Sequence, residues 1–366
     1  MKISAAVASA SDRPFEIVSC DLAEPGPGEV LVKIAACGIC HLDVAVKSLH
    51  MPLSLPRVLG HEGTGVVSAI GRGVEHLVPG DHVLMSYGSC GECRCCVRGM
   101  PSYCAHSFKI NFLGERGRPV THTVDGVSLA SGFFAQSSFA THAISTARNT
   151  IKLDRDLRLE LMAPLGCGFQ TGMGTVMLAL RPKAGDSFAV FGCGSVGMAA
   201  IIAARVVGCS TIIAIDAKSK RLALAREMGA TEVIDATSED VLARIASISK
   251  HGVDFAFDTT GVPGVAEQAL LALSIRGELA LVAPTKPGAK LAFESRAIIS
   301  PGKTIRGVVQ GDAVSSDFVP RMIDFYRRGE LPLERLITTF RFEEINEAVE
   351  AIERGDVLKA VLLMDN

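Results

Sequence analysis

The densest group of chemistry-bearing residues in the sequence is a run of four cysteines separated by short gaps: Cys90, Cys93, Cys96 and Cys104. Gaps of two residues let successive sulfur atoms converge on one ion, and Zn²⁺ binds four thiolates tetrahedrally at about 2.3 Å. Four thiolates close the coordination shell, so the spacing predicts a structural zinc site. Two alternatives stay open: Cys95 in place of Cys96, or reduced cysteines without a metal.

A second set of metal-ligand residues is dispersed along the chain, and each member lies in a turn that contains glycine. The segments are Gly38-Ile39-Cys40-His41, Gly60-His61-Glu62-Gly63 and Gly166-Cys167-Gly168. Two thiolates and one imidazole on a zinc ion leave a fourth position for water or an alcohol oxygen, which the ion activates as a Lewis acid. The alternative is that Cys40 and Cys167 are small buried apolar residues and His61 is a core histidine.

A third pattern is a glycine-rich loop that follows an apolar run at 187–191 and opens a helix. It consists of Gly192, Cys193, Gly194, Ser195, Val196 and Gly197. Glycines let the backbone approach a pyrophosphate, and the free N–H groups of a helix N-terminus bind it. The next apolar run ends in Asp216, whose carboxylate would accept the adenosine ribose hydroxyls and repel a 2′-phosphate. The pattern therefore favours NAD, with the nearby Arg221 either contacting the cofactor or lying on the surface.

The elements that must position these residues fall into three zones. Up to about residue 160, short β-type runs at 29–35, 65–70 and 81–85 are broken by Gly and Pro, which is typical of a β-rich unit. From about 165 to 300, near-continuous apolar strands alternate with helices such as 218–228, which predicts a doubly wound parallel sheet. The tail contains a strand-like run at 304–309 and amphipathic helical stretches at 317–328 and 342–354.

Composition excludes several other classes of function. The 366 residues are 21% charged with a formal net charge of −2 and no block of like charges, so no nucleic-acid partner is expected. Two charge-free stretches, 161–180 and 187–204, are long enough to span a membrane, but their glycines favour buried structure. The N-terminal apolar run is too short for a signal peptide. With eleven clustered cysteines, metal ligation in the cytoplasm is the expectation.

Taken together, these motifs resemble the zinc-dependent medium-chain dehydrogenases over essentially the whole chain. The matching segments are GICHLD at 38–43, GHEGTG at 60–65, the four-cysteine run, PLGCGFQTG at 164–172 and GCGSVG at 192–197. Within the family the sequence looks most like the aryl-alcohol (benzyl-alcohol) dehydrogenase branch. That resemblance is carried by Asn111-Phe112, FFAQSSFATHA at 133–143 and the PLGCG form of the third ligand segment.

The resemblance implies roles residue by residue. The positions that match zinc ligands are Cys40, His61 and Cys167 for a catalytic ion and Cys90, Cys93, Cys96 and Cys104 for a structural ion. Glu62 matches a carboxylate beside the catalytic zinc, although a buried acid paired with a base is the alternative. Asp43 matches a carboxylate that orients a ligand, although it could also cap a helix. His41 and Lys359 fall at positions that contact the cofactor phosphates, and His41 could equally be exposed and unengaged.

One residue departs from the family pattern. The family normally has Ser or Thr after the Cys-His pair, and the hydroxyl of that residue carries the alcohol proton toward the cofactor ribose. This sequence has Leu42 at that position. Ala45, where some relatives carry a histidine that relays the proton, has no group that could replace the hydroxyl. Leucine has neither donor nor acceptor. Three interpretations follow: water or His41 carries the proton, turnover of simple alcohols is slow, or the substrate is bulky and Leu42 shapes its pocket.

The sequence therefore predicts an α/β protein with a GroES-like β-rich catalytic domain at 1–164, to which 301–366 returns, and a Rossmann domain at 165–300. The expected activity is hydride transfer between NAD and a primary aryl or allylic alcohol, with two Zn²⁺ per chain and the active site in the cleft between the domains. Alternatives are a terpenoid alcohol, a formaldehyde–thiol adduct, or a weakened homologue with a binding or structural role. A homodimer or homotetramer, without membrane or nucleic-acid partners, is implied.

Overall fold

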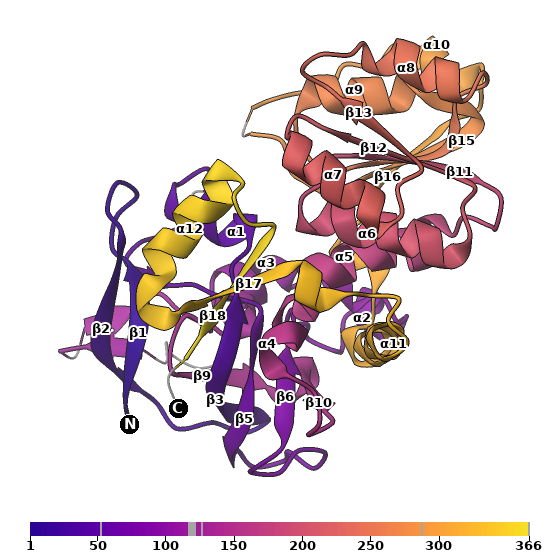
Figure 1. Ribbon diagram of the computed structural model, residues 1–366. Coiled ribbons are helices and arrows are strands. Elements are labelled where there is room, and N and C mark those ends of the chain that lie inside the picture. Colours follow the sequence, from indigo (N-terminus) through magenta and orange to yellow (C-terminus); the bar gives the residue numbers. More distant parts are fainter. Residues whose placement is uncertain (52, 116–121, 126, 287, 365–366) are drawn as a thin grey trace. The chain divides into compact units, whose positions relative to one another are not determined.

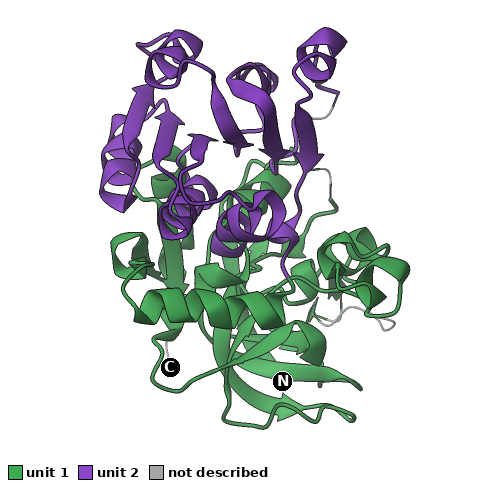
Figure 2. Ribbon diagram, turned by 90° about the vertical axis from the view of Figure 1, so that its right-hand side faces the viewer, with its two compact units in different colours: residues 1–167, 314–366 green, residues 168–313 purple. Residues whose placement is uncertain are grey.

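The protein was analysed as a computed structural model that describes residues 1–51, 53–115, 122–125, 127–286 and 288–364. The chain divides into two compact units, coloured separately in Figure 2. Unit 1 comprises residues 1–167 and 314–366, and unit 2 comprises residues 168–313. Both divisions fall somewhat later in the chain than the predicted ones at 164/165 and 300/301.

Unit 1 contains two sheets of mostly antiparallel strands. The first has the order β4 (Arg57–Val58), β1 (Lys2–Ala8), β2 (Phe15–Leu22), β7 (His122–Val124) and β8 (Val127–Leu129). The second has the order β10 (Thr150–Leu153), β6 (His82–Met85), β5 (Gly63–Ile70), β3 (Glu29–Gly38), β18 (Lys359–Leu363) and β17 (Ile337–Arg341), with β9 (His142–Thr146) also on β3. The runs predicted at 29–35, 65–70 and 81–85 thus form the β3, β5 and β6 strands of one sheet.

The C-terminal tail contributes to this second sheet. Strand β18 pairs antiparallel with β3, with Val361 opposite Gly38, and the yellow β18 lies beside the indigo β3 in Figure 1. Helix α12 (Ile345–Arg354) buries Ile345 and Ile352 in the same core. The other α-helices of unit 1 are α1 (His41–Lys47), α2 (Arg94–Val97), α3 (Ser107–Phe112), α4 (Leu159–Met162) and α11 (Ser315–Arg327).

Unit 2 is a parallel sheet with helical crossovers. Its order is β13 (Glu232–Asp235), β12 (Thr211–Asp216), β11 (Ser187–Phe191), β14 (Val253–Asp258), β15 (Leu273–Leu281) and β16 (Thr304–Gly307), which is the dinucleotide-binding order. Its α-helices are α5 (Gly168–Gly174), α6 (Ser195–Val207), α7 (Ser219–Met228), α8 (Val241–Ile248), α9 (Pro263–Leu271) and α10 (Ser295–Ile299). Ala189, Ile213 and Ala256 are fully buried because helices cover both faces of the central strands.

The position of β16 differs from the prediction. The run at 304–309 was expected in the tail, but Thr304–Gly307 pairs in parallel with β15 and extends the sheet of unit 2. Helix α10 lies between the two strands and supplies the crossover that a parallel pair requires. Helix α7 ends at Gly229, as predicted, and the φ of +123° there requires glycine.

The two charge-free stretches fold as the glycine content predicted. Residues 187–204 form β11, the glycine loop and most of α6. Residues 161–180 form the end of α4, a 3₁₀ turn, α5 and a π-helix at Thr175–Leu180. Among the described residues, every helix is too short or too polar to cross a membrane.

Candidate active site

The dispersed residues Cys40, His61 and Cys167 meet in unit 1. Cys40 precedes the first turn of α1, His61 lies between β4 and β5, and Cys167 follows the 3₁₀ turn Ala163–Gly166. One candidate ligand atom from each of these residues and from Glu62 lies within 4.8 Å of all the others. Gly60 allows the turn into His61, because its φ is +87° and a Cβ would meet the Phe139 backbone nitrogen at 2.4 Å.

The imidazole of His61 is held in one orientation. Its Nδ1 lies 3.0 Å from Oδ1 of Asp43, which also accepts from the Gly60 N–H at 3.0 Å. The second oxygen of Asp43 accepts from the Cys40 N–H at 3.0 Å, so one buried carboxylate organises two candidate ligand segments. His61 Nε2 is buried and has no hydrogen-bond partner among the described residues. A nitrogen left free beside two thiols fits a metal ligand, and its partner carboxylate fits the usual supporting role.

The electrostatics of this cluster favour a cation. A hydrogen bond with Cys167 lowers the pKa of the Cys40 thiol well below its ordinary value, although burial opposes this. Burial also disfavours a charged His61, but the Asp43 carboxylate and Cys40 outweigh it and raise the pKa of His61. Two groups that stabilise positive charge at the imidazole would equally stabilise a divalent ion. The residues present therefore fit the zinc ion that the donor set implies.

Glu62 and Lys359 form a buried ion pair next to the candidate ligands. The Lys359 Nζ lies 2.6 Å from Oε2 and 2.8 Å from Oε1 of Glu62, and it donates to the Ile39 carbonyl at 2.9 Å. Burial raises the pKa of Glu62 to about 7, against the effect of Lys359. Gly38 leaves room for the carboxylate, because a Cβ there would lie 2.0 Å from Oε2.

This pair corrects the prediction for Lys359. A phosphate contact requires an accessible cation, but Lys359 is 2% exposed and its ammonium group is bound to Glu62. The physical reason is that a buried carboxylate without a paired cation would be strongly destabilising, and Lys359 is that cation for Glu62. For Glu62, the structure shows the alternative of a buried acid paired with a base, and it also keeps a carboxylate oxygen within the ligand cluster.

The four-cysteine lobe has the geometry of a closed metal shell. The sulfur atoms of Cys90, Cys93, Cys96 and Cys104 lie within 4.8 Å of one another. Cys90 and Cys96 are 3.9 Å apart, close to the spacing of about 3.8 Å for tetrahedral thiolates at 2.3 Å from zinc. The N–H groups of Cys93 and Ala105 donate to sulfur atoms at 3.3 and 3.4 Å. Cys96, and not Cys95, completes this group of described residues.

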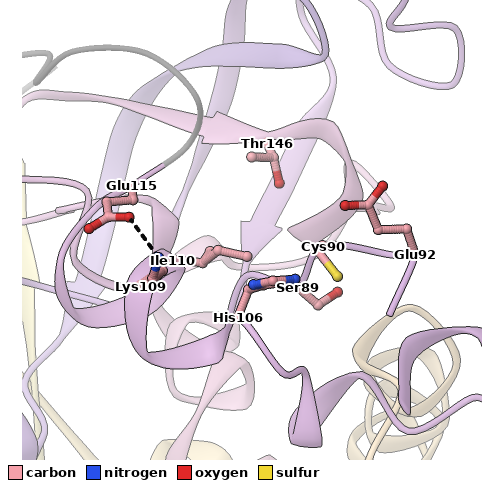
Figure 3. Close-up of a pocket in the computed structure, with 8 residues that line it drawn as sticks. All are labelled: Ser89, Cys90, Glu92, His106, Lys109, Ile110, Glu115 and Thr146. Carbon is pink, nitrogen blue, oxygen red and sulfur yellow. Dashed lines mark ion pairs between the residues drawn. The ribbon is translucent and has the colours of Figure 1, made fainter. Parts of the chain in front are cut away.

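A cavity of about 440 Å³ lies beside this lobe (Figure 3). Its wall carries both signs of charge, from Glu92 and from the ion pair of Lys109 with Glu115, whose charged atoms are 3.9 Å apart, and His106 also lines it. Cys90 lines it, whereas Cys40, His61 and Cys167 are not among its lining residues. The cavity is therefore part of the four-cysteine lobe, and the candidate catalytic ligands do not line it.

The glycine loop of unit 2 connects β11 to α6. Gly192 has a φ of +91°, and a Cβ on Gly197 would lie 1.9 Å from the Gly192 carbonyl oxygen, so both positions require glycine. The Cβ side of Gly194 is open for 4 Å. Helix α6 begins at Ser195, followed by Val196, so the helix N-terminus, with its partial positive charge, adjoins the loop. This cradle fits a dinucleotide pyrophosphate.

Asp216 ends β12 and bonds to the glycine loop. Its Oδ2 accepts from the Cys193 N–H at 2.7 Å, and its Oδ1 accepts from the Lys218 N–H at 2.8 Å. Nη1 of Arg221 lies 3.7 Å from the same carboxylate. The positive charge of Arg221 is thus partly neutralised by Asp216. The Arg221 side chain lies beside this carboxylate and is mostly buried.

The remaining predicted positions lie on α1, and three further residues were missed. His41 is the first residue of α1 and is exposed, while Leu42 and Ala45 are half-buried, with Leu42 packed against the unit 1 core. The missed residues contact the His61 segment: Phe134 stacks on the imidazole with ring centres 4.5 Å apart, and Gln136 donates to the His61 carbonyl at 3.0 Å and to the Ser86 carbonyl at 3.3 Å. Phe134 and Gln136 entered the sequence-based prediction only as part of the run 133–143 that carries the family resemblance, and a single glutamine or serine carries no recognisable signal.

Comparison with known proteins assigns the chain to a family. Residues 26–155 match the alcohol dehydrogenase GroES-like domain, and residues 195–328 match the zinc-binding dehydrogenase model. The chain belongs to the zinc-dependent medium-chain alcohol dehydrogenases, which confirms the predicted family and fold class.

Individual relatives point to the branch. Geraniol dehydrogenase of Castellaniella defragrans is 40% identical over 353 residues, which cover 96% of this chain and 94% of that protein. The crystal structure of benzyl alcohol dehydrogenase from Acinetobacter calcoaceticus is 40% identical, with a TM-score of 0.96 over all of both chains. An alcohol dehydrogenase zinc-binding domain protein from Burkholderia ambifaria is 42% identical, with a TM-score of 0.97, also over all of both chains. The chain is thus similar to the benzyl-alcohol branch.

Proposed function

We propose that this protein is an NAD-dependent zinc alcohol dehydrogenase that converts a primary aryl or allylic alcohol to its aldehyde and reduces NAD⁺ to NADH with release of one proton. The observation that carries the proposal is the cluster of Cys40, His61 and Cys167 around one point, with His61 Nε2 free and a carboxylate behind it. A zinc ion held there would supply Lewis acidity, and a bound nicotinamide would accept the hydride.

The surroundings of the cluster support an aromatic or allylic substrate. The rings of Phe112, Phe133 and Phe134 contact one another, with centres 5.1–6.0 Å apart, and Phe133 and Phe134 both contact His61. Leu42 adds a further apolar side chain on α1. Such a wall favours planar apolar groups. The two named relatives, a benzyl alcohol dehydrogenase and a geraniol dehydrogenase, are named for alcohols of this class.

The cofactor preference rests on Asp216. Its buried carboxylate bonds to the loop that would hold the pyrophosphate, so a 2′-phosphate would meet negative charge. Arg221 Nη1 lies 3.7 Å from this carboxylate, which offsets part of the attraction that the guanidinium would exert on a 2′-phosphate. We also propose two zinc ions per chain, a homodimer or homotetramer, and action in the cytoplasm, where the six ligand cysteines would stay reduced.

The proton route follows from what α1 lacks. Leu42 and Ala45 carry no group that holds a proton, so we propose that a proton leaving the alcohol passes to water or to His41 at the exposed start of the helix. A terpenoid alcohol is the second candidate substrate, favoured by the geraniol dehydrogenase similarity.

The test is the formation of NADH by zinc-loaded protein with benzyl alcohol, cinnamyl alcohol, geraniol and ethanol, and in parallel with NADP⁺. We expect turnover of benzyl or cinnamyl alcohol with NAD⁺ and little with ethanol. Turnover of geraniol alone would favour the terpenoid candidate, and turnover restricted to a formaldehyde–thiol adduct would replace the aryl proposal. Absence of turnover with every alcohol, in protein that binds zinc and NAD⁺, would refute the enzyme proposal in favour of a binding role.

A further inference from the structure

A buried hydrogen-bonded chain links the backbones of two catalytic ligand segments. Gln136 is fully buried, and its Nε2 donates to the carbonyl of His61 at 3.0 Å and to that of Ser86 at 3.3 Å. The Gly63 N–H donates to its Oε1 at 3.1 Å. Ser86, also fully buried, donates through Oγ to the carbonyl of Gly166 at 2.6 Å. Gly166 immediately precedes the candidate ligand Cys167.

The backbone around Gln136 is strained in a way that aims the side chain inward. Phe134, Ala135 and Ser137 have φ values of +51°, +55° and +61°, a region that residues with a Cβ rarely occupy. Such conformations persist where surrounding contacts over-determine them, and they concentrate at functional sites. Here the contacts are the stacking of Phe134 on His61 and the carboxamide bonds of Gln136.

We propose that Gln136 and Ser86 are positioning residues of the catalytic metal site, because together they fix the spacing between the His61 and Cys167 segments. The inference rests on the proposed function, since it assigns them to the metal site of that function. Asp43 holds the side chain of His61 and the backbone of Cys40. The hydrogen bonds from Gln136 to Ser86 and from Ser86 to Gly166 hold the Cys167 segment at a fixed distance from the His61 segment.

The hydrogen bonds of Gln136 and Ser86 hold the backbone of the ligand segments and do not contact the ligand side chains. If Gln136 loses its carboxamide, the His61 carbonyl and the Gly63 N–H lose buried partners on both sides of Glu62. Groups that orient metal ligands typically change metal affinity by about 10–100-fold when they are removed. We therefore expect the metal at this site to leave faster, while the four-cysteine site keeps its ion.

The test uses full-length protein loaded with Co²⁺ in place of zinc. Added imidazole perturbs the visible spectrum only of the cobalt ion that has an open position, which identifies the catalytic site. The rate at which a chelator removes that signal is measured for wild type, Gln136→Met, Ser86→Ala and the double variant. Asn111→Leu is the matched control, because Asn111 is a buried carboxamide whose hydrogen bonds go to Gly88 and Ser107 and not to the backbone of His61, Gly63 or Gly166.

We expect Gln136→Met to lose the imidazole-sensitive cobalt about 10-fold faster or more, and Asn111→Leu to match the wild type. The double variant should lose it little faster than Gln136→Met, because both substitutions break the same chain. Equal rates in Gln136→Met and Asn111→Leu would overturn the proposal. Ser86→Ala is a smaller change and serves as the test if Gln136→Met does not fold. If Ser86→Ala loses its imidazole-sensitive cobalt at the wild-type rate, the proposal is also overturned.

The two proposals fail separately. Wild-type protein that shows the imidazole-sensitive cobalt signal but oxidises no alcohol would refute the proposed function, and the exchange rates would still decide the role of Gln136. Wild-type protein without that signal would overturn the positioning role, because there would be no metal ligands to position.

Discussion

Replacing Lys359 with Met tests the buried ion pair beside the candidate metal site. The substitution keeps a long side chain but removes the cation that lies 2.6 Å from Glu62, and it leaves the Ile39 carbonyl without its donor. Glu62 is fully buried and Lys359 nearly so, and hence water cannot replace the lost partner. The free energy of unfolding should therefore fall substantially.

The magnitude follows from the burial of both groups. Removing one partner of a buried pair costs about 3–5 kcal/mol, whereas removing both often costs much less, because no uncompensated charge remains. We thus expect Lys359→Met to lose about 3–5 kcal/mol at pH 8. The double variant Glu62→Gln, Lys359→Met should regain a large part of that loss.

The pH dependence gives a second, independent signature. Burial raises the pKa of Glu62 from 4.5 to about 7, so the folded state binds this proton more tightly than the unfolded state. Stability from this group therefore falls as pH rises from 4.5 to about 7 and then levels off. Without Lys359 the pKa of Glu62 rises further, and the decline should continue above pH 7 at up to about 1.4 kcal/mol per pH unit.

The assay is urea unfolding of protein from which a chelator has removed the metal, because a bound divalent cation would itself lower the pKa of Glu62. Unfolding is followed by circular dichroism between pH 6 and pH 8.5. Lys303→Met is the control, because Lys303 donates to the Leu270 carbonyl at 2.7 Å and has no carboxylate partner among the described residues. Its loss of stability should not vary with pH over this range. A Lys359→Met variant within about 1 kcal/mol of wild type at pH 8, or a double variant no more stable than Lys359→Met, would refute the ion-pair reasoning.

Three further predictions concern the cofactor, the proton route and the lobe. Asp216→Ser should lower the preference for NAD⁺ over NADP⁺ by about tenfold or more, because it removes the charge that opposes a 2′-phosphate. The preference is measured as the ratio of the kcat/KM values for the two cofactors. An unchanged ratio would show that Asp216 does not discriminate between them. Leu42→Ser should raise kcat for benzyl alcohol by about tenfold if proton release limits turnover, and a wild-type kcat would mean that water or His41 already suffices. Cys93→Ser should lower the zinc content from two ions per chain to one, measured by atomic emission, while Cys95→Ser should keep both; equal zinc in the two variants would contradict the assigned ligand set.

The sequence predicted features that depend on local spacing better than those that depend on distant contacts. The four cysteines of the lobe converge because their gaps are short, and the glycine loop lies between β11 and α6 for the same reason. The strand at 304–307 was assigned to the wrong unit because its own residues do not show which strand it pairs with. Its partner β15 is chosen by the fold of the whole parallel sheet.

Within the site, residue type decided what could be predicted. Cys40, His61 and Cys167 were found because thiols and imidazoles in glycine turns are uncommon, and the family resemblance joined segments that spacing could not. Lys359 was given a phosphate contact because nothing in the sequence shows that Glu62 is buried beside it. Gln136 and Ser86 were missed because their function depends on hydrogen bonds across 75, 50 and 80 residues.

The pairing of β18 with β3 determines when this protein can mature during synthesis. Glu62 is made early, but the lysine that neutralises it lies 297 residues later, on the strand that completes the sheet. All of unit 2 is synthesised between these two residues, before β18 is available to pair with β3. The ion pair beside the candidate metal site can therefore form only after the last strand of unit 1 has been synthesised.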